Sequence, residues 1–266
     1  MLFRSSPDLK ETPKSKAINQ IVDSVKSKYG IDLKVNSEQR YSEKNELEAL
    51  ELGLTNMVII NTTSLVQKYG IRNYDVFELP FIFNDLNSFN KFNNSLISED
   101  LLREVNKKNK NLYALTFWAK DYKHIQSNNQ IKSYKDILNN SFVLENTEIN
   151  QKFKKLINNK TPNMVDLDEL KENSMNKKII YSTMLTLDEA EKSGFFNSGY
   201  KNVFLTYQNL EIDIILVNKR WFNKLSPETQ LGISDIVRNV GVFQQSLMIK
   251  NNINLINKLL TLNRGI

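Results

Sequence analysis

The chain has 266 residues, 40% of them hydrophobic and 25% charged, which is the composition of a folded globular protein. It has no cysteine and one histidine, which excludes thiol catalysis and cysteine-based zinc or iron–sulfur sites and leaves His124 as the sole base for any serine triad. The net charge of +6 comes from basic residues interleaved with acidic ones, so we expect no nucleic-acid binding.

No apolar run approaches the roughly 18 residues that a membrane-spanning helix needs. The first residues, Met1 to Ser6, also lack the apolar stretch of a signal peptide. The residues alone therefore leave two alternatives open: the protein is cytoplasmic, or its signal peptide has been removed.

The first sixty residues predict two successive β-α units. Apolar residues from Ala17 to Val25 recur at helical spacing, and that helix is expected to end near Gly30. Ile31, Leu33 and Val35 alternate with polar residues as in a half-buried strand. A second helix from Leu47 to Leu54, broken by Gly53, precedes a buried strand from Met57 to Ile60. This order predicts a largely parallel sheet covered by helices.

Further strands are expected at Leu112–Trp118, Phe142–Leu144, Ile179–Tyr181, Val203–Thr206 and Ile212–Val217. The C-terminal stretch differs, because Ser226 and Pro227 are a helix N-cap and first helical residue, and a helical apolar period then runs from Ile233 to Leu260. A helix of this length is expected to span two lobes. Since no Pro/Gly-rich linker separates the lobes, they would have to exchange strands.

Three fragments, in this order, carry a resemblance to a known family. Leu47–Met57 is similar to its helix-turn-strand "E-A-L-x-x-G-x-x-D-M", Val76–Asp85 to "V-F-D-L-P-F-L-F-x-D", and Trp221–Gln230 to "W-x-x-L-S-P-E-x-Q". The chain thus resembles the solute-binding receptors of TRAP-type transporters, the DctP family. This resemblance covers nearly the whole chain.

The resemblance implies a two-lobed α/β fold like that of periplasmic binding proteins, with a central cleft and a long helix spanning both lobes. Residues 1–120 with 208–248 would form lobe I, and residues 121–207 with 249–266 would form lobe II. The implied protein is a periplasmic monomer, not an enzyme, and uses no cofactor and no metal. Its partners would be a small organic solute and the membrane subunits of the transporter, and the lobes would close on the solute by hinge bending.

The family's site signature is altered in this sequence. The family has "G-F-R" at the start of the second lobe, then "D-L-K-G-L-K-I-R", whose last Arg forms a two-pronged salt bridge with the solute carboxylate. Here Lys123 replaces the first Arg and Val143 the second, twenty residues on without a gap. A lysine is a point charge rather than a planar fork, and valine offers only apolar surface. We therefore expect a neutral or amphipathic solute, or one carboxylate held by Lys123 as the only cation of the cleft.

The same register places Thr183 where the family has a ligand-contacting Asn. The resemblance puts Val143 on the cleft wall near Lys123, Thr183 and Asn61. Lobe I would contribute Asn61 and Thr62 after the strand ending at Ile60, and Ser6 after the first strand. The alternative for the polar run from Asn61 to Ser64 is that it caps the following helix.

Trp118 and His124 each allow two interpretations. Trp118 could form a stacking floor of the cleft, or it could belong to the core with Phe117, as strand aromatics usually do. His124 next to Asp121 and Lys123 suggests acid–base work, but no nucleophile or proton donor is nominated, and the alternative is a histidine on the rim or surface.

Two functional hypotheses follow. The first is the extracytoplasmic receptor of a TRAP-type transporter with an atypical site. The second is a protein that keeps the binding-protein fold but has become a sensor or interaction protein after losing transport-linked ligand binding. The missing second Arg and the missing "V-D-G-x-E" motif, replaced by Ile179–Ser182, keep the second open.

Overall fold

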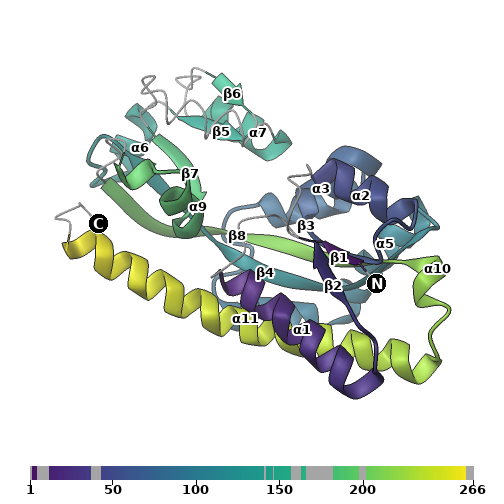
Figure 1. The fold of residues 1–266 in the computed structure, drawn as a ribbon. Helices are drawn as coiled ribbons and strands as arrows, with labels where there is room; N and C mark the ends of the chain where they lie inside the picture. The colour runs from purple at the N-terminus through teal and green to yellow at the C-terminus, as the bar shows by residue number, and fades with distance from the viewer. Residues whose placement is uncertain are drawn as a thin grey trace. The chain divides into compact units, whose positions relative to one another are not determined.

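The computed structural model describes residues 2–4, 12–36, 43–140, 142–145, 147–156, 163–165, 182–197 and 202–261 (Figure 1). The chain divides into two compact units. Unit 1 consists of Met1–Phe77, Phe83–Lys120 and Glu211–Met248, and unit 2 of Glu78–Ile82, Asp121–Leu210 and Ile249–Ile266. Relative to the predicted lobe boundaries, residues 78–82 and 208–210 are assigned differently. The identification of these units with the lobes of a hinged receptor stays a prediction.

Six strands form one sheet in the order β2-β1-β3-β8-β4-β7. The strands are β1 Leu2–Arg4, β2 Lys34–Asn36, β3 Met57–Asn61, β4 Leu112–Ser127, β7 Ser182–Thr186 and β8 Asn202–Asn218. Within this sheet β1 pairs in parallel with β2 and with β3, whereas β3 with β8 and β4 with β7 are antiparallel. The expectation of a largely parallel sheet was therefore wrong beyond the N-terminal β-α units, because β8 returns through the sheet from the far end of the chain.

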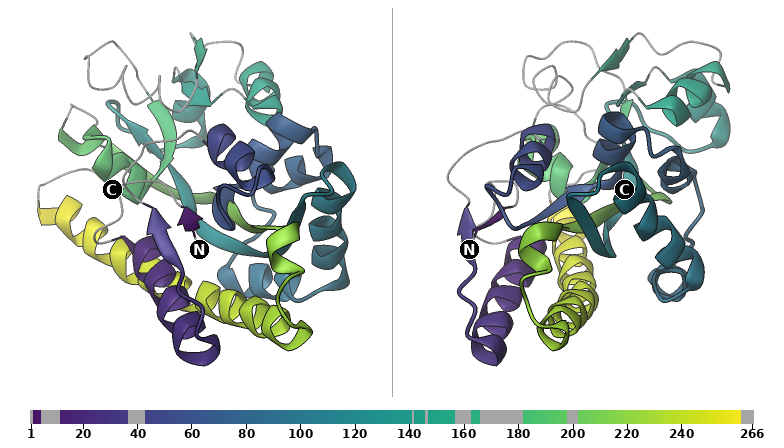
Figure 2. Two further views of the ribbon diagram at one scale, coloured as in Figure 1. Left: turned by 45° about the vertical axis from the view of Figure 1, so that its right-hand side comes forward. Right: turned by 90° about the vertical axis from the view of Figure 1, so that its right-hand side faces the viewer.

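The core of unit 1 lies between this sheet and two helices, α1 (Pro13–Tyr29) and α11 (Pro227–Thr261). Met57 and Ile59 of β3 share a face with Ile215 and Val217 of β8, since alternate residues point the same way and the strands pair Met57 with Val217. Apolar residues of α1 and of the N-terminal half of α11 pack onto that face, side by side in Figures 1 and 2.

The ends of these helices carry capping residues, of which Gly30 and Ser226 were predicted from the sequence. Thr12 accepts a hydrogen bond from the Ser15 amide ahead of α1, and Gly30 ends that helix at a φ of 66°. Ser226 accepts the Thr229 amide at 3.2 Å ahead of α11, whose 35 residues confirm the predicted long helix. The chain passes from unit 1 to unit 2 inside this helix, at Met248.

The described residues of unit 2 include two small apolar clusters. Val143, Leu185, Leu259 and their neighbours form one, and Ile125, Phe142 and Leu144 are in the other. A two-stranded parallel sheet of β5 (Val143–Glu145) and β6 (Asn163–Val165) adjoins β7 through a bridge between Phe142 and Ser182. The remaining helices are α2 Glu43–Glu51, α3 Thr62–Tyr69, η1 Arg72–Glu78, α4 Leu86–Asn93, α5 Leu96–Lys108, α6 Tyr134–Asn139, α7 Glu148–Leu156, α9 Leu187–Lys192, η2 Phe195–Asn197 and α10 Lys219–Phe222. The predicted strand Ile179–Tyr181 lies outside the described residues.

Candidate functional site

In unit 1, polar side chains gather where β3 ends and α3 begins. Asn61 is the N-cap of α3, and its Oδ1 accepts a 2.8 Å hydrogen bond from the Thr63 amide. Thr62 is buried and donates its hydroxyl to the Ile212 carbonyl of β8 at 3.1 Å. The capping alternative for this polar run is therefore present in the structure. The predicted contribution of Asn61 and Thr62 to a solute stays a prediction, and Ser6 lies outside the described residues.

The carboxylate of Glu43, the first residue of α2, reaches the same place. Its Oε1 accepts the Asn61 amide at 3.2 Å, and the hydroxyl of Ser64 donates to its Oε2. Burial raises the pKa of Glu43 above its usual value, and the nearby negative charge of Asp213 adds to that effect, whereas Ser64 and Lys14 oppose it.

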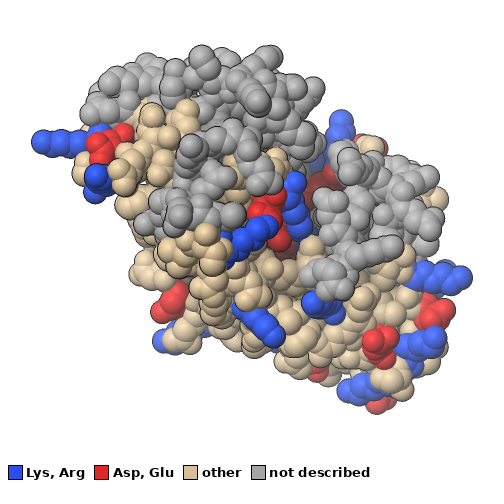
Figure 3. All heavy atoms as spheres, turned by 60° about the vertical axis from the view of Figure 1, so that its left-hand side comes forward, with Lys and Arg blue, Asp and Glu red and all other residues tan. Residues whose placement is uncertain are grey.

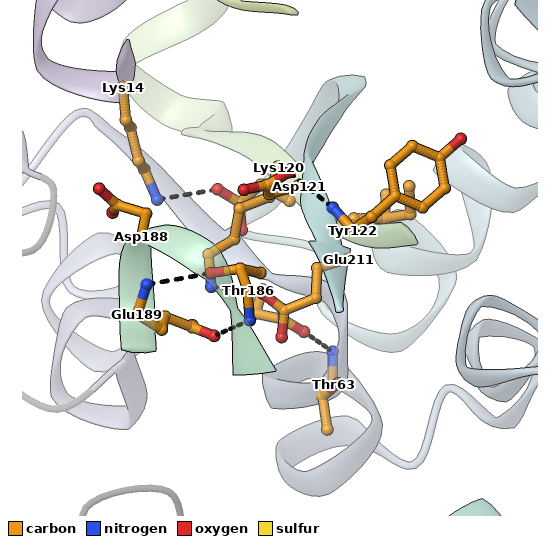
Figure 4. A network of polar contacts seen from close by, with 12 residues as sticks. Lys14, Thr63, Lys120, Asp121, Tyr122, Thr186, Asp188, Glu189 and Glu211 are labelled. Carbon is orange, nitrogen blue, oxygen red and sulfur yellow. Dashed lines mark hydrogen bonds and ion pairs between the residues drawn. The ribbon is translucent and has the colours of Figure 1, made fainter. Parts of the chain in front are cut away.

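Two ion pairs on β8 complete the unit 1 cluster. Asp213 is buried and lies 2.9 Å from the ammonium of Lys14, which projects from the start of α1 (Figure 4). Two residues earlier on the same strand, buried Glu211 lies 2.6 Å from the ammonium of Lys120 on β4. Glu43 and these acids were not predicted from the sequence, although a charged residue, Asp213, inside the apolar run Ile212–Val217 is a visible signal.

In unit 2, the antiparallel pair of β4 and β7 brings two of the predicted residues onto adjacent strands. Lys123 pairs with Thr186, and Thr183 pairs with Gln126. Lys123 is only 8% exposed, and Thr183 is fully buried. The hydroxyl of Thr183 has no hydrogen-bond partner among the residues that the structure describes. A buried hydroxyl without a hydrogen-bond partner destabilises the folded state. A further donor or acceptor next to the Thr183 hydroxyl would remove that penalty.

Val143 begins β5 and is 5% exposed, packed with Leu185, Leu187 and Leu259 in an apolar cluster of unit 2. The bridge between Phe142 and Ser182 holds the start of β5 beside the start of β7, where Thr183 follows. Val143 and Thr183 thus lie in one part of unit 2. The surroundings of Val143 are apolar.

Trp118 belongs to the core of unit 1. It is 2% exposed, its indole Nε1 donates to the Val237 carbonyl at 3.0 Å, and its ring lies against the backbone at Gly241. Trp118 is therefore better described as a core residue than as a stacking floor. Strand alternation directs its ring toward α11, whose apolar face buries it.

The prediction that His124 is a rim or surface histidine was wrong. Its side chain is 1% exposed, and burial lowers its pKa to about 4. The Tyr207 amide donates to Nδ1 at 3.3 Å, so the neutral ring carries its proton on Nε2. That atom has no hydrogen-bond partner among the described residues.

Asp121, the first residue of unit 2 on β4, is a further titratable group, which the sequence indicated only as a neighbour of His124. Burial raises its pKa to about 7, with contributions from the charges of Glu189 and Asp188 on α9 (Figure 4). Two donors partly offset this effect, namely the Asn252 side chain at 2.7 Å and the Tyr122 amide at 2.8 Å.

The described charged residues on the face drawn in Figure 3 are of both signs. Among the residues that are coloured in Figure 3, Lys and Arg are interspersed with Asp and Glu. Within the described ranges, no group of three or more His, Cys, Asp or Glu residues could hold a metal ion. No helix among them is long and apolar enough to cross a membrane.

Comparison with known proteins gives one matching family model. The model described as "DctP: Bacterial extracellular solute-binding protein, family 7" matches residues 9–266. The C4-dicarboxylate-binding periplasmic protein DctP of Rhodobacter capsulatus is 27% identical over 143 residues, which are 52% of this chain and 42% of that protein. The C4-dicarboxylate-binding protein DctB of Bacillus subtilis is 32% identical over 122 residues, 44% of this chain and 33% of that protein. These matched stretches span less than half the length of either relative.

Solved structures share the fold over the whole chain. A TRAP periplasmic solute-binding protein of Pseudomonas aeruginosa with bound L-malate has a TM-score of 0.83 at 18% identity, covering 100% of this chain and 91% of that one. One from Xanthobacter autotrophicus with bound β-D-galacturonate also gives 0.83 at 18% identity, covering 100% and 88%. An apo open structure from Escherichia fergusonii gives 0.85 at 15% identity, again covering 100% and 88%. At these identities the likeness establishes the fold, and it confirms the predicted fold class.

Proposed function

Because the chain belongs to the DctP family of bacterial extracellular solute-binding proteins, we propose that it is the solute receptor of a TRAP-type transporter. The observation that carries this proposal is the family match over residues 9–266, together with a fold shared along the whole chain with TRAP periplasmic solute-binding proteins. In this role the protein is periplasmic and monomeric, captures a small organic solute, and delivers it to the membrane subunits. It performs no chemistry on the solute.

The residues that we propose for solute binding follow the family register. Asn61 and Thr62 belong to unit 1, and Lys123, Val143 and Thr183 belong to unit 2. The buried hydroxyl of Thr183, which lacks a partner among the described residues, supports this choice, because a solute oxygen or N–H would satisfy it. Ser6 belongs to the set by the same register, whereas Trp118 is left out because its ring is buried in the core of unit 1.

The solute we propose carries at most one carboxylate. Lys123 offers one ammonium, whereas an arginine fork binds both oxygens of a carboxylate with two parallel hydrogen bonds. At the register of the second family Arg, Val143 lies among apolar side chains. A second carboxylate enclosed there would go unpaired, which costs on the order of several kcal/mol. Neutral, amphipathic or singly anionic solutes fit this surface better than C4-dicarboxylates.

The test is a thermal-shift screen of the unmodified protein against a few hundred metabolites, including L-malate, succinate, D-galacturonate and neutral analogues. A ligand present at about a hundred times its Kd adds about 2.7 kcal/mol of stability, which is a clear shift of the melting temperature. A neutral or monocarboxylate hit, with malate weaker by tenfold or more, is expected. Micromolar binding of an ordinary C4-dicarboxylate would overturn the proposed site.

A second candidate function is that of a sensor or interaction protein that has kept the fold but not solute uptake. The observation that favours it is the burial of Val143 in an apolar cluster at a position the family uses for a charged clamp. A screen without any shift, followed by a failure of the membrane subunits to take up solute in the presence of the protein, is the outcome that this candidate expects.

A further inference from the structure

The chain passes between the two units in three segments that contact one another through residues of unit 2. The chain enters unit 2 at Asp121 on β4, leaves it after Leu210 on β8, and visits it briefly at Glu78–Ile82. Contacts within unit 2 join the ends of these segments directly. The residues that make the contacts are Phe81, His124 and Tyr207.

Tyr207 has an unusual backbone conformation. Its φ is 48°, in the left-handed region that residues with a Cβ rarely adopt. Its amide donates to Nδ1 of His124 at 3.3 Å, and its ring meets the imidazole edge-on, with the centroids 4.7 Å apart. The His124 side chain therefore holds both the main chain and the side chain of Tyr207.

Phe81 repeats this conformation on the neighbouring segment. Its φ is 61°, and its amide donates to the carbonyl of Gln208, the residue after Tyr207, at 2.5 Å. The Phe81 side chain is 61% exposed and that of Tyr207 is 47% exposed. Burial of these side chains therefore offsets little of the free energy that the positive φ costs at either residue. Backbone strain of this kind persists only where surrounding contacts enforce it, and it concentrates in parts that switch.

His124 is suited to hold this arrangement in one state. Burial keeps the imidazole neutral, because it lowers the pKa to about 4. Nδ1 therefore remains an acceptor for the Tyr207 amide across the neutral range. A backbone change at Tyr207 that turns its amide away would leave Nδ1 buried and unsatisfied, so an intermediate position is unfavourable and the contact is either made or lost.

We propose that Phe81, His124 and Tyr207 form a latch that holds the crossing segments in one backbone state, and that the latch opens when Tyr207 leaves the left-handed region. The inference rests on the proposed function, since a hinge-bending receptor needs a few residues at its crossings that absorb a large change of φ and ψ. The two strained residues and the buried acceptor supply that bistable element.

The first experiment compares two substitutions that both remove the Tyr207 ring and that differ in their tolerance of a positive φ. Tyr207→Asn permits the left-handed conformation, whereas Tyr207→Val strongly disfavours it. Phe204→Val, at an exposed position of the same strand, is the matched control. Because the chain has no cysteine, Leu96→Cys in unit 1 and Lys135→Cys in unit 2 place two spin labels cleanly on exposed residues.

Pulsed electron paramagnetic resonance then measures the distance distribution between the labels without any solute. We expect Tyr207→Val to shift the distribution away from that of the parent protein, while Tyr207→Asn and Phe204→Val leave it unchanged. A distribution for Tyr207→Val that coincides with the parent overturns the proposal. Since no ligand enters the measurement, this outcome is independent of whether the screen for a solute succeeds.

A second measurement applies even if Tyr207→Val fails to fold. His124 is the only histidine, so nitrogen-15 labelling of histidine gives one imidazole spectrum, which we expect to show the Nε2-protonated tautomer. Hydrogen exchange of the Tyr207 amide should be slow in the parent protein and about tenfold faster in His124→Phe, which keeps a ring but removes the acceptor. An Nδ1-protonated ring, or equal exchange in both proteins, contradicts the latch.

Discussion

The side-chain amide of Asn252 donates a 2.7 Å hydrogen bond to Oδ1 of Asp121, joining the unit 2 end of α11 to the first unit 2 residue of β4. Earlier in the same helix, the Gln244 side chain donates to the Lys120 carbonyl at 3.4 Å, within unit 1. Helix α11 therefore contacts β4 at both residues of the Lys120–Asp121 peptide bond. Asp121 titrates at this point, which makes the stability of the connection sensitive to pH.

Replacing Asp121 by Asn should stabilise the protein above pH 7. Burial raises the pKa of Asp121 from 3.8 to about 7, so the folded protein holds a proton that the unfolded chain releases. Stability from this group is present below pH 3.8 and is lost as pH rises to 7, by about 4 kcal/mol. Asn252 and the Tyr122 amide can still donate to the side-chain oxygen of the introduced asparagine. Urea denaturation of both proteins should show a much larger gain at pH 8 than at pH 5.

Asp136→Asn is the control for that comparison. Asp136 is partly exposed, and its pKa is lowered by hydrogen bonds from the Lys132 amide and from Ser133. Its charged form is favoured by folding, so its removal should bring no gain at pH 8. An equal gain in both variants would mean that surface charge, rather than the burial of Asp121, sets the pH dependence.

The opposite pH dependence is expected from His124. Burial lowers its pKa from 6.5 to about 4, so the unfolded chain binds a proton that the folded protein does not. This contribution falls as pH drops from 6.5 to 4, by up to about 3 kcal/mol. It overlaps the Asp121 titration with the reverse sign and is best measured in the Asp121→Asn protein. There, His124→Gln should flatten the stability profile between pH 4 and 6.5, and an unchanged slope would exclude His124 as its source.

The sequence predicted the elements whose signals are local. Ser226 with Pro227 marked the start of α11, Gly30 marked the end of α1, and the family fragments identified the fold. The burial of His124 could not be foreseen, because it depends on Tyr207, which is remote along the chain and adopts a left-handed backbone that tyrosine does not signal. The role of Glu43 likewise depends on β3 and α3, which the chain brings to the start of α2 only after folding.

Two glycines of α11 should respond differently to substitution by alanine. A Cβ on Gly241 would lie 2.7 Å from the Trp118 indole, which is buried and anchored to the Val237 carbonyl. A Cβ on Gly232 would lie 1.6 Å from the hydroxyl oxygen of Tyr29, which is the far end of a partly buried side chain at the end of α1, so that side chain must swing outward to make room. Alanine gains about 1 kcal/mol over glycine inside a helix, whereas overpacking costs about 1–3 kcal/mol. Gly241→Ala should lower the melting temperature and Gly232→Ala should not. The reverse order would contradict the packing of Trp118.

Lys123→Ala should weaken the binding of a singly anionic solute. With D-galacturonate as the probe, we expect the affinity measured by calorimetry to fall by about tenfold or more, because a hydrogen bond to a charged group contributes about 1.5–3 kcal/mol. Lys132→Ala, which removes an exposed lysine of the same unit, should leave the affinity unchanged. If galacturonate binds both variants equally, Lys123 does not contact the carboxylate.

The substitution Val143→Arg would restore the charge that the family places at this position. Val143 is 5% exposed and packs against Leu185, Leu187 and Leu259. An arginine there would bury a charge among apolar side chains, so we expect a loss of about 3–5 kcal/mol in the free energy of unfolding and no gain in affinity for L-malate. Val143→Met keeps the position apolar and should cost less than about 1.5 kcal/mol. An Arg variant as stable as the Met variant would show that position 143 faces a polar, accessible surface. Tighter malate binding by that variant would further show that the site still has the form of a carboxylate clamp and lacks only the guanidinium.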